Sequence, residues 1–346
     1  MIDATVKAPR RPGTREAVVL AVVLAIGVAV GLGLYADFGK LGSALAGFRW
    51  ELFPAALALT SAGYLLRFAR WQVYLRRVGI DVPAGRSLVI FLAGVSMTLS
   101  PGKVGEVLKS VLLRRAYGTP VQRSAPVVLA ERVTDMLGTV VVAGVAAVWA
   151  GAASRWPLVL VGLAVAVAVV AALHLPLPRR LERVRAARDT ALALHTPGLL
   201  ASMSAVATVA WACEAGAAIV CVKGLGLDVA AASAAVAYAL GNLVGSLSFL
   251  PGGLGVAETS MTGLLRALSG TSAAGAAAAT VLIRIATLWY AVAVGLVALA
   301  IEERIARRGS GSAAPGPSAP GPSAPGPSAP GPSAPGPAAA EQPPAS

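Results

Sequence analysis

The sequence predicts an all-α polytopic membrane protein with about six transmembrane helices and two Pro-Gly-broken re-entrant segments, arranged as two inverted three-element repeats. The first observation is composition: of 346 residues, 56% are hydrophobic and 13% charged, with a mean hydropathy of +0.74. Soluble domains of this length do not carry such a balance. The second is that several uncharged runs approach the ~20 residues that cross a bilayer. The third is a pair of motifs that interrupt apolar runs, "LSPGKVGE" at 99–106 and "FLPGGLGVAE" at 249–258.

The first apolar run, 17–36, follows a basic stretch and resembles a signal peptide in that respect. It is long for the apolar region of a signal peptide and lacks a convincing cleavage site before Asp37, so we interpret it as a retained span. Near the end of the second span, Arg67, Arg70 and Trp71 are interpreted as an interfacial anchor. The expected spans are 17–36, 53–75, 126–150, 157–175, 198–222 and 275–300, and the interrupted segments are 87–113 and 229–266.

Residues 17–305 are expected to form one transmembrane domain, preceded by an N-terminal segment at 1–16. The C-terminal segment, 306–346, is rich in Pro, Gly, Ser and Ala and repeats "APGPS". Such a composition has no apolar face to bury, so this segment is predicted to be a disordered tail.

Most Lys and Arg residues lie in the N-terminal segment and in four stretches, 76–86, 114–123, 179–188 and 304–308. The positive-inside rule assigns these stretches to the cytoplasm. The sequence therefore predicts a multi-pass protein of the cytoplasmic membrane with both termini inside.

Segment 87–113 has basic loops on both sides and should enter and leave at the cytoplasmic face. Its first arm, 87–100, would be about 21 Å long as a helix, short of the ~30 Å hydrocarbon core. A re-entrant hairpin with Pro101 and Gly102 at its tip is expected. The second segment should dip in from outside, although its longer first arm could itself span the membrane.

The two interrupted segments align with each other. "PGKVGE" (101–106) matches "PGGLGVAE" (251–258), which has two extra residues, and "VLAERVTD" (128–135) matches "TVLIRIAT" (280–287). The repeat units, about 53–150 and 198–300, would begin on opposite sides and so be inverted. Inverted repeats with broken helices are typical of transporters that bind substrate near the midplane. The alternative is chance similarity of two Pro-Gly kinks.

Each Pro-Gly break begins a half-helix whose free N–H groups and positive dipole end favour an anion, phosphate especially. Glycine lets the backbone approach a ligand, and embedded charges normally face a cavity or a partner. The alternative for Arg132 with Asp135, and for Glu106 with Lys109, is an internal ion pair. Glu214 is a further embedded acid. The candidate substrate-binding residues are Pro101, Gly102, Lys103, Gly105, Glu106, Lys109, Glu131, Arg132, Asp135, Pro251, Gly252, Gly253, Gly255, Glu258 and Arg284.

Several other functions are disfavoured. The net charge of +13 lies mainly in short loops rather than on a basic helix with aromatics, which argues against nucleic acid. Cys213 and Cys221 are about 12 Å apart along one expected helix, too far for a disulfide. His174 and His195 have no second metal ligand at useful spacing. We therefore expect no metal and no cofactor.

Four motifs carry a resemblance to a known family: "FLAGVSMTLSPGKVGEVLKSVLLRR", "APVVLAERVTDMLG", "GNLVGSLSFLPGGLGVAE" and "LIRIATLWY". The chain resembles the flippase-like family, the transmembrane region of lysylphosphatidylglycerol synthases and its stand-alone relatives, over about residues 15–305. The resemblance implies that membrane lipids with an anionic or phosphate-containing headgroup are the partners. It also implies a separate lipid-modifying or glycosyltransferase enzyme as a candidate partner, because low-complexity sequence stands where a synthase domain would follow.

The expected function is therefore translocation of a lipid or lipid-linked saccharide, with no catalytic residues. The alternative is a membrane-embedded transferase acting on polyprenyl-phosphate or phospholipid substrates. Against it, the chain has no complete Gly-rich nucleotide loop and no evident Ser/His or Cys/His arrangement. A scaffold without transport would not need five embedded acids.

Overall fold

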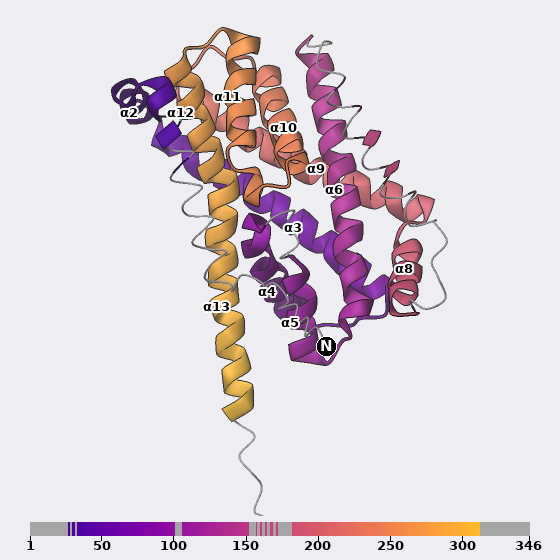
Figure 1. Ribbon diagram of the computed structural model, residues 1–346. Helices are drawn as coiled ribbons and strands as arrows, with labels where there is room; N and C mark the ends of the chain where they lie inside the picture. Colours follow the sequence, from indigo (N-terminus) through magenta and orange to yellow (C-terminus); the bar gives the residue numbers. More distant parts are fainter. Residues whose placement is uncertain are drawn as a thin grey trace, which may run out of the picture. The chain divides into compact units, whose positions relative to one another are not determined.

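The computed structural model describes residues 27, 30–31, 33–100, 106–151 and 182–311, together with isolated positions between 157 and 171. Every regular element within these ranges is helical, which confirms the expected all-α class (Figure 1). The chain divides into two units after Ala306, and the contacts described below lie in the first unit.

Within the described residues, four helices are long and apolar enough to cross a membrane. They confirm four of the six expected spans; most residues of the other two, 17–36 and 157–175, lie outside the described residues. The four are α3 (Phe53–Arg77, after a 3-10 turn at Trp50–Leu52), α6 (Val121–Trp149), α9 (Pro197–Gly224), and α12 (Ala273–Arg284), which continues through a π-helical turn (Ile285–Trp289) into α13 (Tyr290–Gly311).

Two shorter helices, α2 (Phe38–Ala46) and α8 (Glu182–Leu194), flank this core. Because α13 runs to Gly311, residues 306–311 are helical, and the prediction that the disordered tail begins at 306 is wrong for them. The helix continues there because Ala306, Arg307 and Arg308 are strong helix formers. The rest of the tail and the segment 1–16 lie outside the described residues.

Local chemistry sets the helix boundaries. Pro197 occupies the first turn of α9, where its missing N–H breaks no intrahelical bond. Ser272 caps α12 by accepting a hydrogen bond of 3.1 Å from the backbone N–H of Gly275. Gly118 and Gly270 follow the ends of two shorter helices in the left-handed conformation that glycine adopts readily.

Both interrupted segments consist of helices separated by a break, as expected. The first comprises α4 (Ala84–Val95), a 3-10 turn (Ser96–Leu99) and α5 (Leu108–Tyr117). The second comprises α10 (Ala231–Leu247), a 3-10 turn (Pro251–Gly253) and α11 (Val256–Ser269). At 17 residues, α10 is about 25 Å long and so shorter than the ~30 Å hydrocarbon core.

Each broken segment is a hairpin whose two ends lie close together. At the base of the first hairpin, Arg123 Nε donates a 2.9 Å hydrogen bond to the carbonyl of Val78. At the base of the second, a Cβ on Gly275 would lie 2.9 Å from Leu227 Cδ2. Helices α10 and α11 pack without space for a methyl group, since a Cβ on Gly245 would lie 2.7 Å from that of Ala257.

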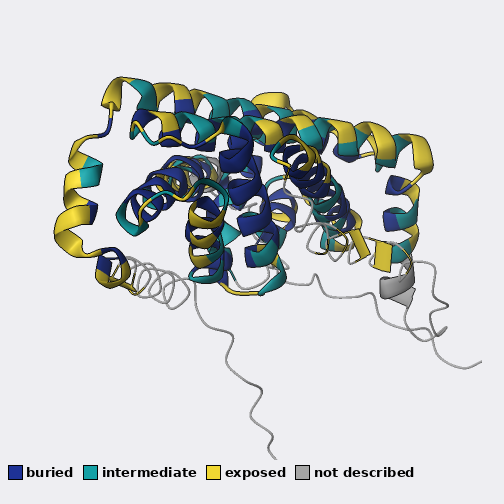
Figure 2. Ribbon diagram, turned by 90° about the horizontal axis from the view of Figure 1, so that it is seen from above, coloured by how far each residue is buried: buried dark blue, intermediate teal, exposed yellow. Residues whose placement is uncertain are grey.

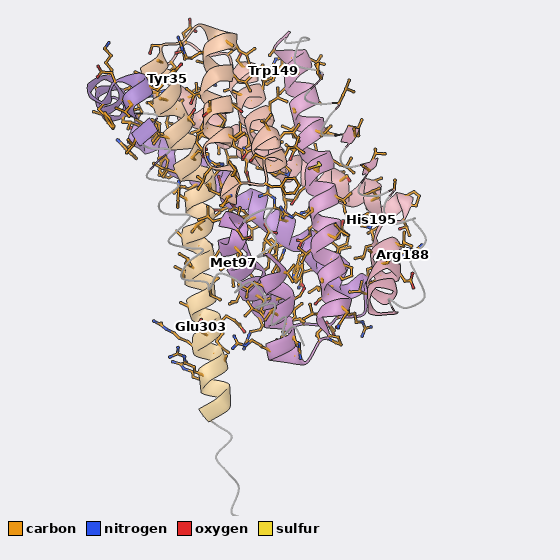
Figure 3. All side chains as sticks on the ribbon, viewed as in Figure 1. Tyr35, Met97, Trp149, Arg188, His195 and Glu303 are labelled. Atoms are coloured by element: carbon orange, nitrogen blue, oxygen red, sulfur yellow. The ribbon has the colours of Figure 1, made fainter. Side chains whose placement is uncertain are left out.

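The two hairpins lie in opposite halves of the helical body, α4 and α5 in the lower half of Figure 1 and α10 and α11 in the upper half. The long helices that follow them run in opposite directions: α6 ends at Trp149 near the top, and α13 passes Glu303 near the bottom (Figure 3). Helices α3 and α9 are antiparallel, since the N–H of Arg49 donates to the carbonyl of Gly224 over 2.9 Å. Two inverted units would have this arrangement, and the repeat itself stays a prediction.

Burial follows the pattern of a helical bundle in lipid. Figure 2 shows buried positions in the centre and exposed positions on the outer faces of the peripheral helices. On α6, Val141, Val145 and Val148 form an exposed apolar stripe, whereas Ala143 and Ala147 are fully buried. The exposed stripe is suited to contact with acyl chains.

The basic stretches meet at one end of the body. Arg86 binds both carboxylate oxygens of Glu302 at 2.8 Å, which joins α4 to α13. The Arg123–Val78 contact joins one further basic stretch, 114–123, to stretch 76–86 at this end. This grouping agrees with the sidedness deduced from the sequence, while the assignment of that end to the cytoplasm stays a prediction.

Candidate functional site

The described parts of the two hairpins meet in the middle of the body. The 3-10 turn Ser96–Leu99 contacts the turn Pro251–Gly253, and a Cβ on Gly252 would lie 2.9 Å from Leu99 Cδ2. A cavity of about 310 Å³ lies here, lined by both tips and by α3, α6, α9 and the α12–α13 helix. The candidate residues Pro101, Gly102, Lys103 and Gly105 lie outside the described residues.

The second tip has a backbone that only glycine adopts without strain. Gly252, Gly253 and Gly255 have φ values of 61°, 68° and 85°. Gly255 precedes the first turn of α11, and its N–H donates a 2.6 Å hydrogen bond to Glu258 Oε2. The carboxylate of Glu258 therefore occupies the N-terminus of this half-helix, the position that the sequence argument assigned to a bound anion. Pro251 begins the 3-10 turn and is buried.

Arg284 ties this tip to the long helix that follows it. Its Nη2 donates a 2.7 Å hydrogen bond to the carbonyl of Gly252. Its Nε lies 2.5 Å from Glu258 Oε1, an ion pair whose angles fall outside hydrogen-bond geometry. Arg284 is the last residue before the π-helical turn, a feature that is frequent at functional sites.

The first hairpin has the same kind of contact. Arg132 Nη2 donates a 2.7 Å hydrogen bond to Glu106 Oε2. Lys109 Nζ lies 2.5 Å from Glu131 Oε2 and 3.9 Å from Glu106. The internal ion pair Glu106–Lys109 therefore exists, but it is longer than the pairs that each residue makes with α6.

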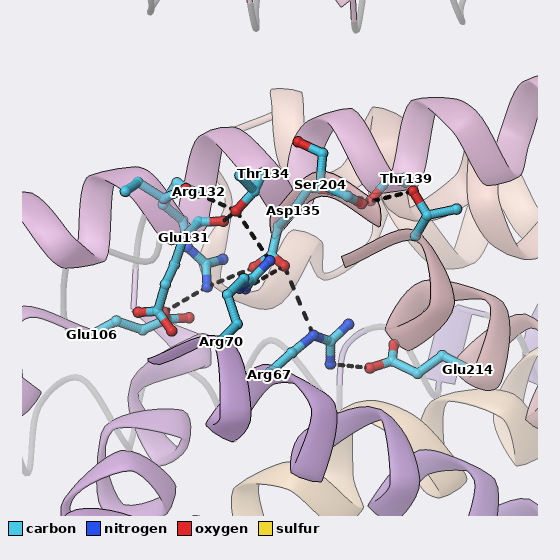
Figure 4. Close-up of polar contacts among 12 residues, drawn as sticks. Arg67, Arg70, Glu106, Glu131, Arg132, Thr134, Asp135, Thr139, Ser204 and Glu214 are labelled. Atoms are coloured by element: carbon cyan, nitrogen blue, oxygen red, sulfur yellow. Dashed lines mark hydrogen bonds and ion pairs between the residues drawn. The ribbon is translucent and has the colours of Figure 1, made fainter. Parts of the chain in front are cut away.

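Asp135 lies between three guanidinium groups (Figure 4). Arg70 Nη2 donates to its Oδ1 over 2.7 Å, Arg132 Nη2 lies 3.2 Å from its Oδ2, and Arg67 Nε is 3.9 Å from its Oδ1. Arg67 also pairs with Glu214, which accepts a hydrogen bond from the hydroxyl of Tyr238. One network therefore connects α3, α6, α9 and α10.

The prediction that Arg67, Arg70 and Trp71 form an interfacial anchor is wrong. Arg70 and Trp71 have exposed fractions of 1% and 0%, and Arg67 lines the cavity. A signal was present in the sequence, because Arg67 precedes the end of its helix by ten residues, about 15 Å. That depth is unfavourable for a side chain reaching an interface, and it implies internal partners instead.

The model of a family described as the lysylphosphatidylglycerol synthase TM region matches residues 19–295. The chain belongs to this family. It is also 25% identical over 329 residues to a UPF0104 membrane protein of Methanothermobacter thermautotrophicus, an alignment that covers 82% of this chain and 93% of that protein. The range matched by the family contains both hairpins and the whole charged network.

In this family member, the charged side chains that the structure describes around the cavity balance in number. The cations are Arg67, Arg70, Lys109, Arg132 and Arg284, and the carboxylates are Glu106, Glu131, Asp135, Glu214 and Glu258. Each carboxylate has at least one cationic partner within 4 Å. Arg132 and Arg284 were predicted to be charges available to a phosphate, whereas the structure shows each of them already paired with a glutamate.

By contrast, the buried hydrogen-bond donors around the cavity are not all matched by acceptors. Among the described cavity-lining residues, every buried side-chain N or O atom without a hydrogen-bond partner is a nitrogen of Arg or Trp, and hence a donor. The cavity wall is therefore rich in unused donors. Within the same residues, no group of three His, Cys, Asp or Glu side chains could hold a metal ion.

Proposed function

We propose that this protein translocates a phosphate-containing amphiphile, a lipid or a lipid-linked saccharide, across the cytoplasmic membrane. The observation that carries the proposal is the cavity where the two hairpin tips meet. Irregular backbone at membrane depth is tolerated where it is enclosed by protein or lines a cavity. Transporters with broken helices place their substrate at such a junction.

The size of the cavity supports a headgroup as the occupant. Its 310 Å³ is at the lower end of the roughly 300–1,000 Å³ range of ligand pockets. A polar headgroup fits this volume, and the hydrocarbon chains would remain outside. Phe249 and Leu250 line the cavity and are exposed, so an apolar wall is available next to the polar one.

The connections between elements support a motion of two halves. Glu106–Arg132 ties the first tip to α6, and Glu258–Arg284 ties the second tip to α12. Each hairpin tip is therefore tied to its own long helix, while the Arg86–Glu302 pair, which joins the first hairpin to α13, would open during such a motion. We propose that the halves rock about the α3–α9 pair and open the cavity to each end in turn, with a separate lipid-modifying or glycosyltransferase enzyme supplying the substrate.

Transport by purified protein tests the proposal. The full chain is reconstituted in liposomes containing phosphatidylglycerol with a fluorescent acyl chain, and the label in the outer leaflet is quenched by a membrane-impermeant reductant. We expect faster loss of protected label than in protein-free liposomes, and a reduced rate for Arg132→Ala. Val145→Ala, on the lipid-facing stripe, is the matched control and should transport normally.

Two outcomes would contradict translocation. One is a rate equal to that of protein-free liposomes for both phosphatidylglycerol and polyprenyl-phosphate probes. The other is recovery of lipids whose headgroups have been chemically altered, as detected by mass spectrometry, which would favour a transferase.

A further inference from the structure

The antiparallel pair α3–α9 brings two donor side chains together at the cavity wall. A Cβ on Gly63 would lie 3.0 Å from the carbonyl oxygen of Ala210, so the two helices approach closely there. Arg67, one turn after Gly63, and Trp211, next to Ala210, then face each other. The guanidinium carbon of Arg67 lies 4.7 Å from the centre of the Trp211 ring.

The partners of Arg67 leave part of its guanidinium unused. Its Nη1 binds Glu214, and its Nε is 3.9 Å from Asp135, beyond hydrogen-bond distance. Its Nη2 and Nε, and the indole Nε1 of Trp211, are buried donors without a hydrogen-bond partner. Trp211 is 8% exposed, and both residues line the cavity. Buried donors left unmatched in this way are positioned to bind an acceptor that enters the cavity.

The residues of the cavity wall indicate which kind of group can accept hydrogen bonds from these donors. Every carboxylate of the network already has a cationic partner, and the buried groups left without a partner at the wall are N–H donors, which favour an acceptor over an ammonium group. A phosphate brings several acceptor oxygens and matches a guanidinium with two adjacent free N–H groups. The N-terminus of α11 is a poorer position for it, since the carboxylate of Glu258 already accepts the N–H of Gly255 there.

We propose that the phosphate of the substrate binds to Arg67 and Trp211 on the α3–α9 pair, with the free Nε of Arg132 as a further donor, rather than at the half-helix N-termini. This assignment rests on the proposed function for its choice of a lipid phosphate. Arg132 has the most exposed side chain of the ion pairs around the cavity, 32%, and is therefore the cation that an entering headgroup meets first. Arg67 and Trp211 lie deeper and hold the phosphate.

Binding of a defined lipid to purified full-length protein tests this assignment. The probe is dihexanoyl phosphatidylglycerol, titrated calorimetrically, with dihexanoyl glycerol as the analogue without phosphate and inorganic phosphate as the headgroup without chains. We expect the phospholipid to bind, the glycerol analogue to bind at least about 10-fold more weakly, and inorganic phosphate to compete only at high concentration. Competition by inorganic phosphate as strong as that of the lipid would instead identify a site for free phosphate and overturn the assignment to a lipid.

Two variants distinguish the effect of losing a hydrogen-bond donor from the effect of changing the packing of Arg67 and Trp211. Trp211→Phe keeps an aromatic ring under Arg67 and removes only the N–H, and should weaken phospholipid binding about 10-fold while dihexanoyl glycerol binds as before. Arg67→Lys keeps a charge beside Glu214 but loses the forked donors, and should weaken binding at least as much. Trp149→Phe, at the exposed end of α6, is the matched control and should bind normally.

The outcomes separate this proposal from translocation. If Trp211→Phe and Arg67→Lys elute as monodisperse proteins and bind the phospholipid as the unmodified chain does, the assignment is wrong even where transport is intact. If the unmodified chain binds the phospholipid and both variants lose affinity, the assignment stands even if liposome assays show no transport.

Discussion

Arg284 lies 2.5 Å from Glu258, the residue 26 positions before it, at the second hairpin tip. The same separation joins Arg132 to Glu106, at 2.7 Å, at the first. In each case a glutamate at the start of a half-helix binds an arginine of the next long helix. The sequence alignment, which matched these residues after allowing for two inserted positions, thus corresponds to equivalent contacts in space.

The two glutamates are expected to be functionally related. Glu258→Gln keeps an oxygen that can accept the N–H of Gly255 but leaves Arg284 without its carboxylate. Breaking a buried pair in this way costs about 3 kcal/mol, so a lower thermal unfolding temperature is expected. Transport should fall for Glu258→Gln and for Glu106→Gln. If both variants transport at the normal rate with an unaltered pH profile, neither carboxyl takes part in the transport cycle or carries a proton.

Arg132→Lys tests whether geometry or charge matters in α6. Arg132 Nη2 contacts Glu106 and Asp135 at once, at 2.7 and 3.2 Å, and a lysine ammonium on a flexible stem does not reproduce this planar fork. We expect transport to fall by about 10-fold, which corresponds to roughly 1.4 kcal/mol. Arg115→Lys, an exposed arginine outside the network, is the control for the same substitution. Equal transport rates in the two variants would show that Arg132 serves only as a charge.

Close packing of the second hairpin can be tested with one methyl group. An alanine at position 245 would bring its Cβ to 2.7 Å from that of Ala257, so Gly245→Ala should separate α10 from α11 at a cost of about 1–3 kcal/mol. Gly263→Ala, on α11, meets no atom within 4 Å and should be neutral or slightly stabilising. Thermal unfolding of the purified variants measures both. A stable Gly245→Ala protein with normal transport would contradict this packing.

The Arg86–Glu302 pair holds the first hairpin to α13 at the basic end. Arg86→Glu places two carboxylates together and should lower the unfolding temperature, whereas the double variant Arg86→Glu with Glu302→Arg should recover much of the loss. The comparison of single and double variants measures the coupling between the two side chains. Equal losses in the single and double variants would mean that the pair does not contribute to holding these helices together.

Membrane topology is tested by cysteine labelling in a chain from which Cys213 and Cys221 have been replaced. Asp81 and Thr119 lie at the two ends of the first hairpin, whose base is closed by the Arg123–Val78 contact. The labelled variants are Asp81→Cys and Thr119→Cys. Both should react with an impermeant reagent from the cytoplasmic side only. Labelling from opposite sides would mean that segment 87–113 crosses the membrane.

Part of this structure could be read from local sequence. The spans at α3, α6, α9 and α12–α13 were predictable because hydropathy is a property of neighbouring residues. The break at Pro251–Gly253 was predictable for a similar reason, since it depends on backbone preferences within a few positions. The alignment of Glu106 with Glu258, and of Arg132 with Arg284, was also visible in the sequence.

Tertiary structure decided which charges are paired and which donors remain free. The partner of Arg67 is Glu214, 147 residues away, and it is reached only because α3 and α9 pack closely at Gly63. Likewise, Lys109 pairs mainly with Glu131 rather than with its helical neighbour Glu106. A long side chain reaches partners on any helix within several ångströms, so its partner depends on how helices distant in sequence pack together. Local sequence was enough to predict the spans and the interruptions, whereas the packing of α3 against α9 brings Arg67 and Trp211 together at the cavity.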